Sequence, residues 1–391
     1  MIRKLAPILG ITFIDILGFS MLIPMLPYFV THFGAAPVVA GLLFTTFSLC
    51  QLIAAPLWGN ASDRIGRKHV LIISQIGATI GWATLAFAPN LLIVFIARII
   101  EGLSGGNISI TQAYVADLVA PNERARAFGY IGATFAGAMV FGPVGGGLLF
   151  ARFGFTAPFL AAAALQFITL LVTYFMLPES KPKPEDQEAH VGFGDVFATL
   201  RNPHLARILR QKLALSLALY GYYSVIALYL QGQLGFTLFQ TDIAFAVYAA
   251  FTVLVNAVLI GRASERFGDR RMSTIGLALL VLALALLPFV HNLLLLAVAY
   301  ISLTIGVGFA NTGITASISA LASEREQGTV LGVSSSLDSV AGVIAPPIST
   351  GMLTRWGSPF AGIESLVFAA IALALGLRLG RPPLNAPAES S

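Results

Sequence analysis

Long apolar stretches alternate with short polar segments along the entire chain. A helix of roughly 20 residues crosses a bilayer core about 30 Å thick, and about twelve apolar stretches reach that length. We place them at residues 5–29, 38–58, 69–88, 91–116, 127–150, 155–177, 207–230, 241–261, 272–290, 293–319, 329–353 and 361–379. The pattern therefore predicts an all-α integral membrane protein with twelve transmembrane helices.

Composition narrows the class of protein further. Of the 391 residues, 57% are apolar and 10% are charged, whereas a soluble globular protein carries roughly 25% charged residues. Together with a mean hydropathy of +0.84, this excludes a soluble enzyme, a disordered chain and a disulfide-stapled secreted domain. The single cysteine, Cys50, and the five histidines outside the span interiors or at their ends form no metal or catalytic cluster. We expect no enzymatic activity, no metal and no cofactor.

Basic residues are distributed unevenly between the two ends of the predicted helices. With the amino terminus in the cytoplasm, 20 of the 23 lysines and arginines fall on the cytoplasmic side, and only Arg152 and Arg355 fall outside. This asymmetry predicts that both termini are cytoplasmic and that the protein is a multi-pass component of the inner (plasma) membrane. The net charge of +5 therefore reports orientation in the lipid bilayer and implies no nucleic-acid partner.

The second half of the chain repeats the first at an offset of about 202 residues. Both copies contain the motif Gly-x-Ala-Ser-acid-Arg-x-Gly, at 59–66 and at 261–268. A polar, proline-containing segment separates the copies. We therefore predict two pseudo-symmetric six-helix bundles, at residues 1–180 and 207–391, joined by a cytoplasmic linker at 181–206.

Several motifs resemble those of one transporter family. The segment 59–68 resembles the signature of the major facilitator superfamily between spans two and three. Residues 98–102 resemble its proton-antiporter motif, and residues 142–146 resemble its exporter motif, with Ala138 in place of the usual first glycine. Residues 15–18 resemble the first span of the tetracycline exporters. Over its whole length the chain resembles the twelve-span drug/proton antiporters, which implies the major facilitator fold.

Four charged residues are predicted to lie deep in the bilayer: Asp15, Arg98, Glu101 and Asp338. A charge at that depth costs about 2.5–3.5 kcal/mol on insertion scales, a cost that a carboxyl group can avoid by binding a proton. We interpret all four residues as candidates for proton coupling. Simpler interpretations stay open: Asp15 bonded to a neighbouring helix, a local Arg98–Glu101 pair, and an Asp338 carboxyl satisfied by nearby serines.

The segment that resembles the family signature also suggests a conformational latch. The resemblance implies a tight turn at Gly59 and Gly66, contact of Asp63 with the start of span eleven, and pairing of Arg64 with Asp117. These residues and Arg67 would together hold the outward-open state. The alternative is that the basic residues only keep this loop in the cytoplasm.

Two further sets of residues complete the predicted site. Glycine and proline in span five would form a kinked packing face or a seal against proton leak, and the sequence leaves both interpretations open; they are Gly142, Pro143, Gly145 and Gly146. Amide and tyrosine side chains in the spans would make a pocket both apolar and hydrogen-bonding; the candidates are Asn107, Gln112, Tyr222, Tyr223, Asn256 and Asn311.

These features predict a monomeric secondary transporter that exports small amphiphilic compounds in exchange for protons by alternating access. The alternative is a proton-coupled importer of a small organic solute. The tetracycline exporters carry ionisable residues in spans three, eight and nine, whereas we find no Asp, Glu or His in the interiors of those predicted spans. Tetracycline itself is therefore not carried over as the substrate.

Overall fold

The computed structural model describes residues 2–105, 107–119, 123–179, 203–321 and 327–378. Most of the described chain is helical, because a backbone surrounded by hydrocarbon must satisfy its N–H and C=O groups internally. The first group of helices, called the N-terminal half below, comprises α1 (Ile2–His32), α2 (Val38–Ile65), α3 (Arg67–Ala86), α4 (Leu91–Leu103), α5 (Asn107–Leu118), α6 (Arg124–Phe153) and α7 (Thr156–Met176).

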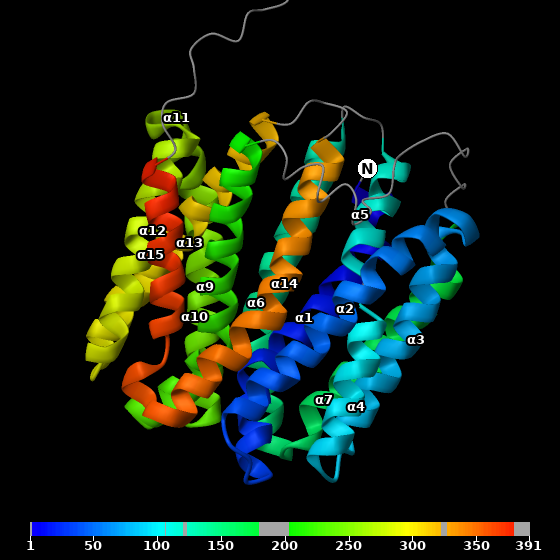
Figure 1. Cartoon of the computed structure of the whole chain (residues 1–391). Helices are drawn as coiled ribbons and strands as arrows, with labels where there is room; N and C mark the ends of the chain where they lie inside the picture. Colours follow the sequence, from blue (N-terminus) through cyan, green and yellow to red (C-terminus); the bar gives the residue numbers. More distant parts are fainter. Residues whose placement is uncertain (1, 106, 120–122, 180–202, 322–326, 379–391) are drawn as a thin grey trace, which may run out of the picture.

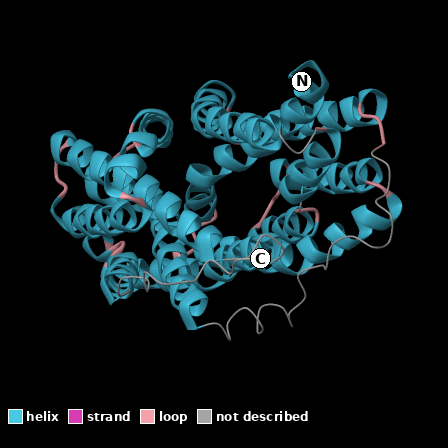
Figure 2. Ribbon diagram, turned by 90° about the horizontal axis from the view of Figure 1, so that it is seen from above, coloured by secondary structure: helices cyan, strands magenta, loops and turns pink. Residues whose placement is uncertain are grey.

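The second group, called the C-terminal half, comprises α9 (Pro203–Leu234), α10 (Leu238–Val258), α11 (Ile260–Phe267), α12 (Asp269–Leu286), α13 (Leu293–Leu321), α14 (Gln327–Trp356) and α15 (Ile363–Arg378), with short 3-10 turns η2 (Leu287–Phe289) and η3 (Ser358–Phe360). Seen from above, the helices gather in two groups that lie side by side (Figure 2). Most of the predicted linker at 181–206 lies outside the described residues, and Pro203 already belongs to α9.

The chain reverses direction at two opposite ends of the molecule. At one end, called the Gly154 end, the turns contain Gly34, Gly154, Gly235 and Gly357, all with positive φ. At the other, called the Gly66 end, the two copies of the repeated motif turn at Gly66 (φ 98°) and Gly268 (φ 72°), where only glycine avoids strain. The predicted tight turn therefore involves Gly66 alone, since Gly59 lies inside α2.

Ten of the described helices are long and apolar enough to cross a membrane, which agrees with the predicted all-α membrane architecture. The predicted span 91–116 is not one continuous helix: it breaks between α4 and α5. Gly102, Ser104 and Gly105 weaken the helix there, and the Ser104 carbonyl accepts a hydrogen bond from Ser74 of α3. The remaining expected span corresponds to α14, which is rich in serine, glycine and proline.

The two halves meet at the Gly154 end. Hydrogen bonds cross from Tyr28 Oη to the Phe236 carbonyl (3.2 Å), from Val38 N to Thr354 Oγ1 (3.0 Å) and from Thr45 Oγ1 to the Val343 carbonyl (2.8 Å). The N-terminal parts of α2 pack against the C-terminal part of α14, and α6 packs against α10. Figure 1 shows α1 and α2 leaning toward α14 at this end, which lies at the bottom of the view.

Within the C-terminal half, α12 and α13 approach each other through facing glycines. A Cβ atom added to Gly306 would lie 2.7 Å from the Leu280 backbone nitrogen, and Gly276 has equally close backbone neighbours on α13. Small residues allow such contact between helices in lipid, where van der Waals packing stabilises their association. This pair is therefore intolerant of added volume.

Replacing Gly306 with leucine is expected to destabilise the protein by about 1–3 kcal/mol, because the side chain would overpack the α12–α13 contact. Thermal unfolding of the purified protein in detergent measures the change. Gly132→Leu is the matched control, since nothing lies within 4 Å of a Cβ at Gly132. Equal melting temperatures for the two variants would contradict the packing argument.

Candidate functional site

Arg98 and Glu101 form a buried ion pair on α4. Arg98 is 2% exposed and Glu101 is 7% exposed, and the Arg98 Nη1 group donates to Glu101 Oε2. The guanidinium also lies 4.5 Å from the centre of the Phe47 ring of α2, a cation–π contact. Gly81 of α3 makes room for Glu101, because a Cβ there would lie 2.5 Å from Glu101 Cγ. The structure thus shows the local Arg98–Glu101 pair that the simpler interpretation expected. The proton-coupling role of both residues stays a prediction.

Asp338 of α14 is paired with a lysine. Lys212 Nζ of α9 lies 3.0 Å from Asp338 Oδ1 and donates to Asn311 Oδ1 of α13 at 3.2 Å. Ser216 of α9 also donates to the Asp338 carboxylate, whereas Ser336, one of the expected serine neighbours, bonds its own helix at Gly332. Three helices of one half therefore converge on this carboxylate.

Lys212 corrects the count of charges within the helices. The sequence analysis assigned it to the cytoplasmic set because it follows Arg207 and Arg210 near the start of a span. In the structure α9 begins earlier, at Pro203, and the Lys212 side chain is buried at 9% exposure. A long apolar stem with a terminal ammonium can lie within a helix bundle when a carboxylate is in reach, which the sequence does not reveal.

Asp15 lies near the middle of α1, with an intermediate exposure. It comes from the N-terminal half, whereas Asp338 comes from the C-terminal half. The two carboxylates of the prediction therefore belong to different halves of the molecule.

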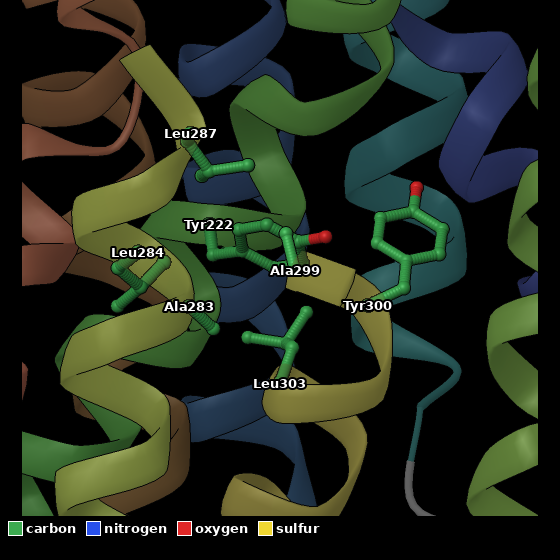
Figure 3. Close-up of a pocket in the computed structure, with 7 residues that line it drawn as sticks. All are labelled: Tyr222, Ala283, Leu284, Leu287, Ala299, Tyr300 and Leu303. Carbon is green, nitrogen blue, oxygen red and sulfur yellow. The ribbon is translucent and has the colours of Figure 1, made fainter. Parts of the chain in front are cut away.

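The candidate substrate residues fall into two environments. Tyr222 and Tyr223 of α9 belong to a buried tyrosine cluster: Tyr223 Oη lies 3.3 Å from Tyr248 Oη, and the ring centres of Tyr248 and Tyr300 are 5.8 Å apart. Tyr222 and Tyr300 line a gap closed by Leu284, Leu287 and Leu303, with no room for a water molecule (Figure 3). In this conformation Tyr222 is thus part of the packed core.

The amide candidates are more accessible. Gln112, Asn256 and Asn311 are exposed, and Asn311 accepts the Lys212 hydrogen bond described above. The side chain of Asn107 lies outside the described residues. Asn311 is thus linked to the candidate proton-coupling residue Asp338 through Lys212, which contacts both side chains.

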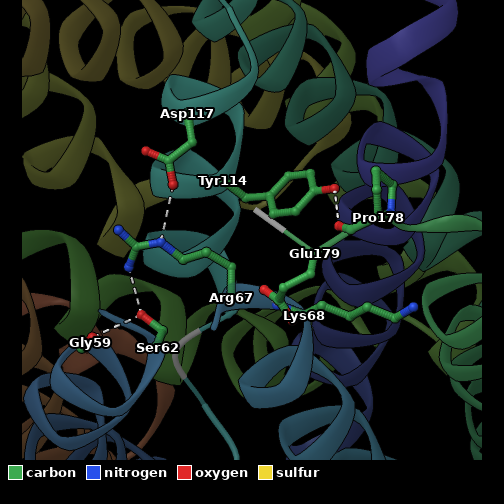
Figure 4. Close-up of polar contacts among 8 residues, drawn as sticks. All are labelled: Gly59, Ser62, Arg67, Lys68, Tyr114, Asp117, Pro178 and Glu179. Atoms are coloured by element: carbon green, nitrogen blue, oxygen red, sulfur yellow. Dashed lines mark hydrogen bonds and ion pairs between the residues drawn. The ribbon is translucent and has the colours of Figure 1, made fainter. Parts of the chain in front are cut away.

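At the predicted latch, the arginine that pairs with Asp117 differs from the one expected. Arg67, not Arg64, pairs with Asp117: Arg67 Nε lies 3.4 Å from Asp117 Oδ2, and Arg67 Nη1 donates to Ser62 Oγ at 2.6 Å (Figure 4). Arg64 is exposed two residues before Gly66, where the chain reverses and directs Arg67 toward α5. The Asp63 side chain lies outside the described residues, so its contact with α14 stays a prediction.

Glu179, which the sequence analysis did not select, holds the start of α3. Its carboxylate accepts from Lys68 N at 3.1 Å and lies 2.8 Å from His69 Nδ1, so a negative charge stands at the positive end of a helix. Tyr114 of α5 donates to the neighbouring Pro178 carbonyl at 2.7 Å (Figure 4). In the sequence, Glu179 could have been noticed as part of a Pro-Glu pair directly after an apolar span.

The exporter motif packs α6 against α1. A Cβ on Gly142 would lie 2.7 Å from the Leu17 carbonyl oxygen, and Gly146 is in similar contact with the Met21 side chain. Pro143 lies within α6, and Gly145 faces open space. The close α1–α6 contact supports a packing face, which would also serve as a seal.

Two buried carboxyl groups escaped the sequence analysis. Asp242 of α10 is 0% exposed, and Glu364 of α15 is 6% exposed with hydrogen bonds from Ser349 and Ser365. Both lie within the first four residues of a predicted span, at 241–261 and at 361–379, and neither was among the four charges predicted to lie deep in the bilayer. The statement that span eight lacks an acidic residue in its interior is therefore wrong, because α10 begins at Leu238 and includes Asp242.

Comparison with known proteins decides the family. The model of the Major Facilitator Superfamily matches residues 8–251 and 212–391. This chain belongs to the major facilitator superfamily. The two matches overlap and together span residues 8–391, so the family predicted from the motifs is confirmed.

Relatives within the superfamily are drug-resistance proteins. The chain is 31% identical to the tetracycline resistance protein, class C, of Escherichia coli, over 95% of both chains. It is 28% identical to multidrug resistance protein 1 of Bacillus subtilis, over 94% of this chain and 92% of the relative. The protein is thus a multi-pass membrane transporter with tetracycline and multidrug resistance proteins among its relatives.

Solved structures share the fold at lower sequence identity. The human organic anion transporter MFSD10 superposes with a TM-score of 0.72 at 21% identity, over 96% of this chain and 99% of the other. A bacterial homologue of the human lysosomal transporter Spinster, in an inward-facing and unoccupied conformation, gives 0.80 at 16% identity, over 96% of both chains. These likenesses support the major facilitator fold.

Arg67→Ala is expected to lower the free energy of unfolding by about 1–2 kcal/mol, because it removes charge-assisted hydrogen bonds to Asp117 and Ser62. Arg64→Ala is the matched control, since Arg64 is exposed and lies three residues before Arg67, and it should change the free energy of unfolding by less than about 0.5 kcal/mol. Thermal unfolding in detergent distinguishes the two. A larger loss of stability for Arg64→Ala than for Arg67→Ala would favour the predicted pairing of Arg64 with Asp117.

Lys212→Met is expected to destabilise the protein more than the double variant Lys212→Met with Asp338→Asn, since the single change leaves a carboxylate without its cation. A double-mutant cycle of melting temperatures measures this coupling. Additive effects of the two substitutions would show that the pair contributes no interaction energy.

Proposed function

We propose that this transporter exports small amphiphilic compounds in exchange for protons, by alternating access across the inner (plasma) membrane. The observation that carries the proposal is its similarity, over 95% of its length, to a tetracycline resistance protein. Asp15 and Asp338 support it, because they place a titratable group near the middle of a long helix in each half. Carboxyl groups at such positions are typical of proton relays in transporters.

Orientation assigns the two ends of the molecule to the two sides of the membrane. The distribution of lysine and arginine puts both termini, and therefore the Gly66 end, in the cytoplasm. The Gly154 end, where hydrogen bonds join the halves, then faces outward. An exporter in this arrangement receives its substrate from the cytoplasm, and separation of the halves at the Gly154 end releases it.

The residues that converge on Asp338 favour a substrate with a positive charge or a hydrogen-bonding group. Asp338 keeps 35% of its side chain exposed although Lys212 contacts it, so a cationic amphiphile could compete for the carboxylate. A proton on Asp338 would remove that competition and release the compound. Exchange of a proton for a compound at one carboxylate is the simplest form of coupling.

Proton-coupled import of a small organic solute is the alternative. The same coupling residues would serve it, and the two differ in the direction of substrate movement. Close packing of α1 on α6 at Gly142 and Gly146, within the segment that resembles the exporter motif, favours export. We further propose that the protein acts as a monomer of two six-helix bundles.

Asp15→Asn is expected to abolish uphill efflux while leaving part of substrate binding, because the amide cannot exchange a proton. Transport by proteoliposomes with an imposed pH gradient, followed with a panel of cationic amphiphiles and tetracycline, measures efflux. A membrane potential of 100 mV contributes about 2.3 kcal/mol per proton, so coupled wild-type protein should sustain a gradient of several tens-fold.

Asp15→Glu is the matched control, since it retains a carboxyl group and should retain coupling. Uphill transport by Asp15→Asn at the wild-type level would remove Asp15 from the mechanism. Substrate accumulation in the opposite direction under the same gradient would favour the importer.

A further inference from the structure

Asp242 is a fully buried carboxyl group without a hydrogen-bond partner in the described part of the protein. It lies on the first turns of α10, in the C-terminal half, and none of its surface is exposed. Neither carboxylate oxygen has a hydrogen-bond partner among the described residues. An acidic residue placed in this way calls for a functional explanation, because burial of an unpaired charge is costly.

The opposite half encloses this carboxyl group. Gly147 of α6 faces it so closely that a Cβ on Gly147 would lie 2.5 Å from Asp242 Oδ2 and 3.0 Å from Asp242 Cβ. Tyr28 of α1, also from the N-terminal half, is close enough for the charge of Asp242 to act on its hydroxyl. That hydroxyl donates to the Phe236 carbonyl at 3.2 Å. Asp242 is therefore covered only while the halves meet at the Gly154 end.

Glu364 provides an internal comparison. It is buried at the same end, but its carboxylate accepts from Ser349 and Ser365 within its own half. Movement of the N-terminal half would leave these bonds in place. Burial of Glu364 is thus a property of one half, whereas burial of Asp242 depends on contact between the two.

Among the described residues, the helices packed against α10 bring no second charge to Asp242. Tyr28 is the titratable group beside it, and Tyr223 of α9 and Tyr300 of α13 instead meet Tyr248, six residues further along α10. Tyrosine hydroxyls are neutral below about pH 10. The charged groups at the outer ends of α1 and α6, His32 and Arg152, are exposed.

We propose that Asp242 is a proton-binding site that must be occupied for the two halves to close at the Gly154 end. The neutral acid can be enclosed beneath Gly147, whereas the ionised carboxylate favours separation of the halves, which admits water to it. The site binds its proton from the side to which the Gly154 end opens. This deepens the proposed function, on which it rests for the identity of that side: an external proton closes the transporter after release of the compound.

The experiment measures the distance between the halves without any substrate. Spin labels at exposed positions 152 and 355, in a Cys50→Ala background, report opening of the Gly154 end by pulsed electron resonance in nanodiscs. For one fully coupled proton, the closed-to-open ratio should rise by up to about tenfold per unit fall in pH. Asp242→Asn should stay closed and lose this dependence, whereas Glu364→Gln should retain it.

A second pair of variants tests the enclosure itself. Gly147→Ala should require a lower pH for closure, because its methyl group overlaps Asp242. Gly132→Ala, on the same helix but with nothing within 4 Å of an added Cβ, should match the wild type. Wild-type pH dependence in Asp242→Asn, or an unshifted closure in Gly147→Ala, would overturn the proposal. If the wild-type protein showed no proton-driven efflux but kept the pH dependence of the spin-label distance, the result would contradict the proposed function alone.

Discussion

Direct backbone contact between the two halves at the Gly154 end is the constraint on which the rest of the structure depends. Gly41 of α2 admits the Pro346 carbonyl of α14, where a Cβ would lie 2.5 Å from the oxygen, and Gly147 of α6 admits Asp242 of α10. Larger residues at these positions would hold the halves apart. Because these contacts and the hydrogen bonds between the halves lie at one end, the proposed alternating access would require the halves to separate there.

Charged groups follow the same division between contacts within a half and contacts across the halves. Arg98 pairs with Glu101, and Lys212 pairs with Asp338, within their own halves, so separation of the halves would not by itself break either pair. Asp242 has its cover from the other half and no hydrogen-bond partner in the described residues. The free energy of such a group changes with conformation, which is the property that links protonation to movement.

At the Gly66 end, the sequence predicted the turn but not the ion pair beside it. The motif at 59–66 marks the turn in sequence, and the left-handed conformation of Gly66 is a local consequence of it. Whether Arg64 or Arg67 then reaches Asp117 depends on the angle between α2, α3 and α5. Similarly, Glu179 meets α3 only because α7 ends beside it.

By itself the sequence determined the membrane helices, the internal repeat and the family, and it predicted an orientation in the membrane, because hydropathy, charge asymmetry and glycine turns act through local or bilayer forces. Tertiary structure decided which charges are buried and with whom. Lys212 and Asp242 lie within the first six residues of their predicted spans, at 207–230 and 241–261. Because α9 and α10 begin three to four residues earlier, at Pro203 and Leu238, both side chains lie deeper in the helices than the sequence indicated. Their partners, or the lack of a hydrogen-bond partner at Asp242 in the described chain, follow from helix packing, which brings together residues far apart in the sequence.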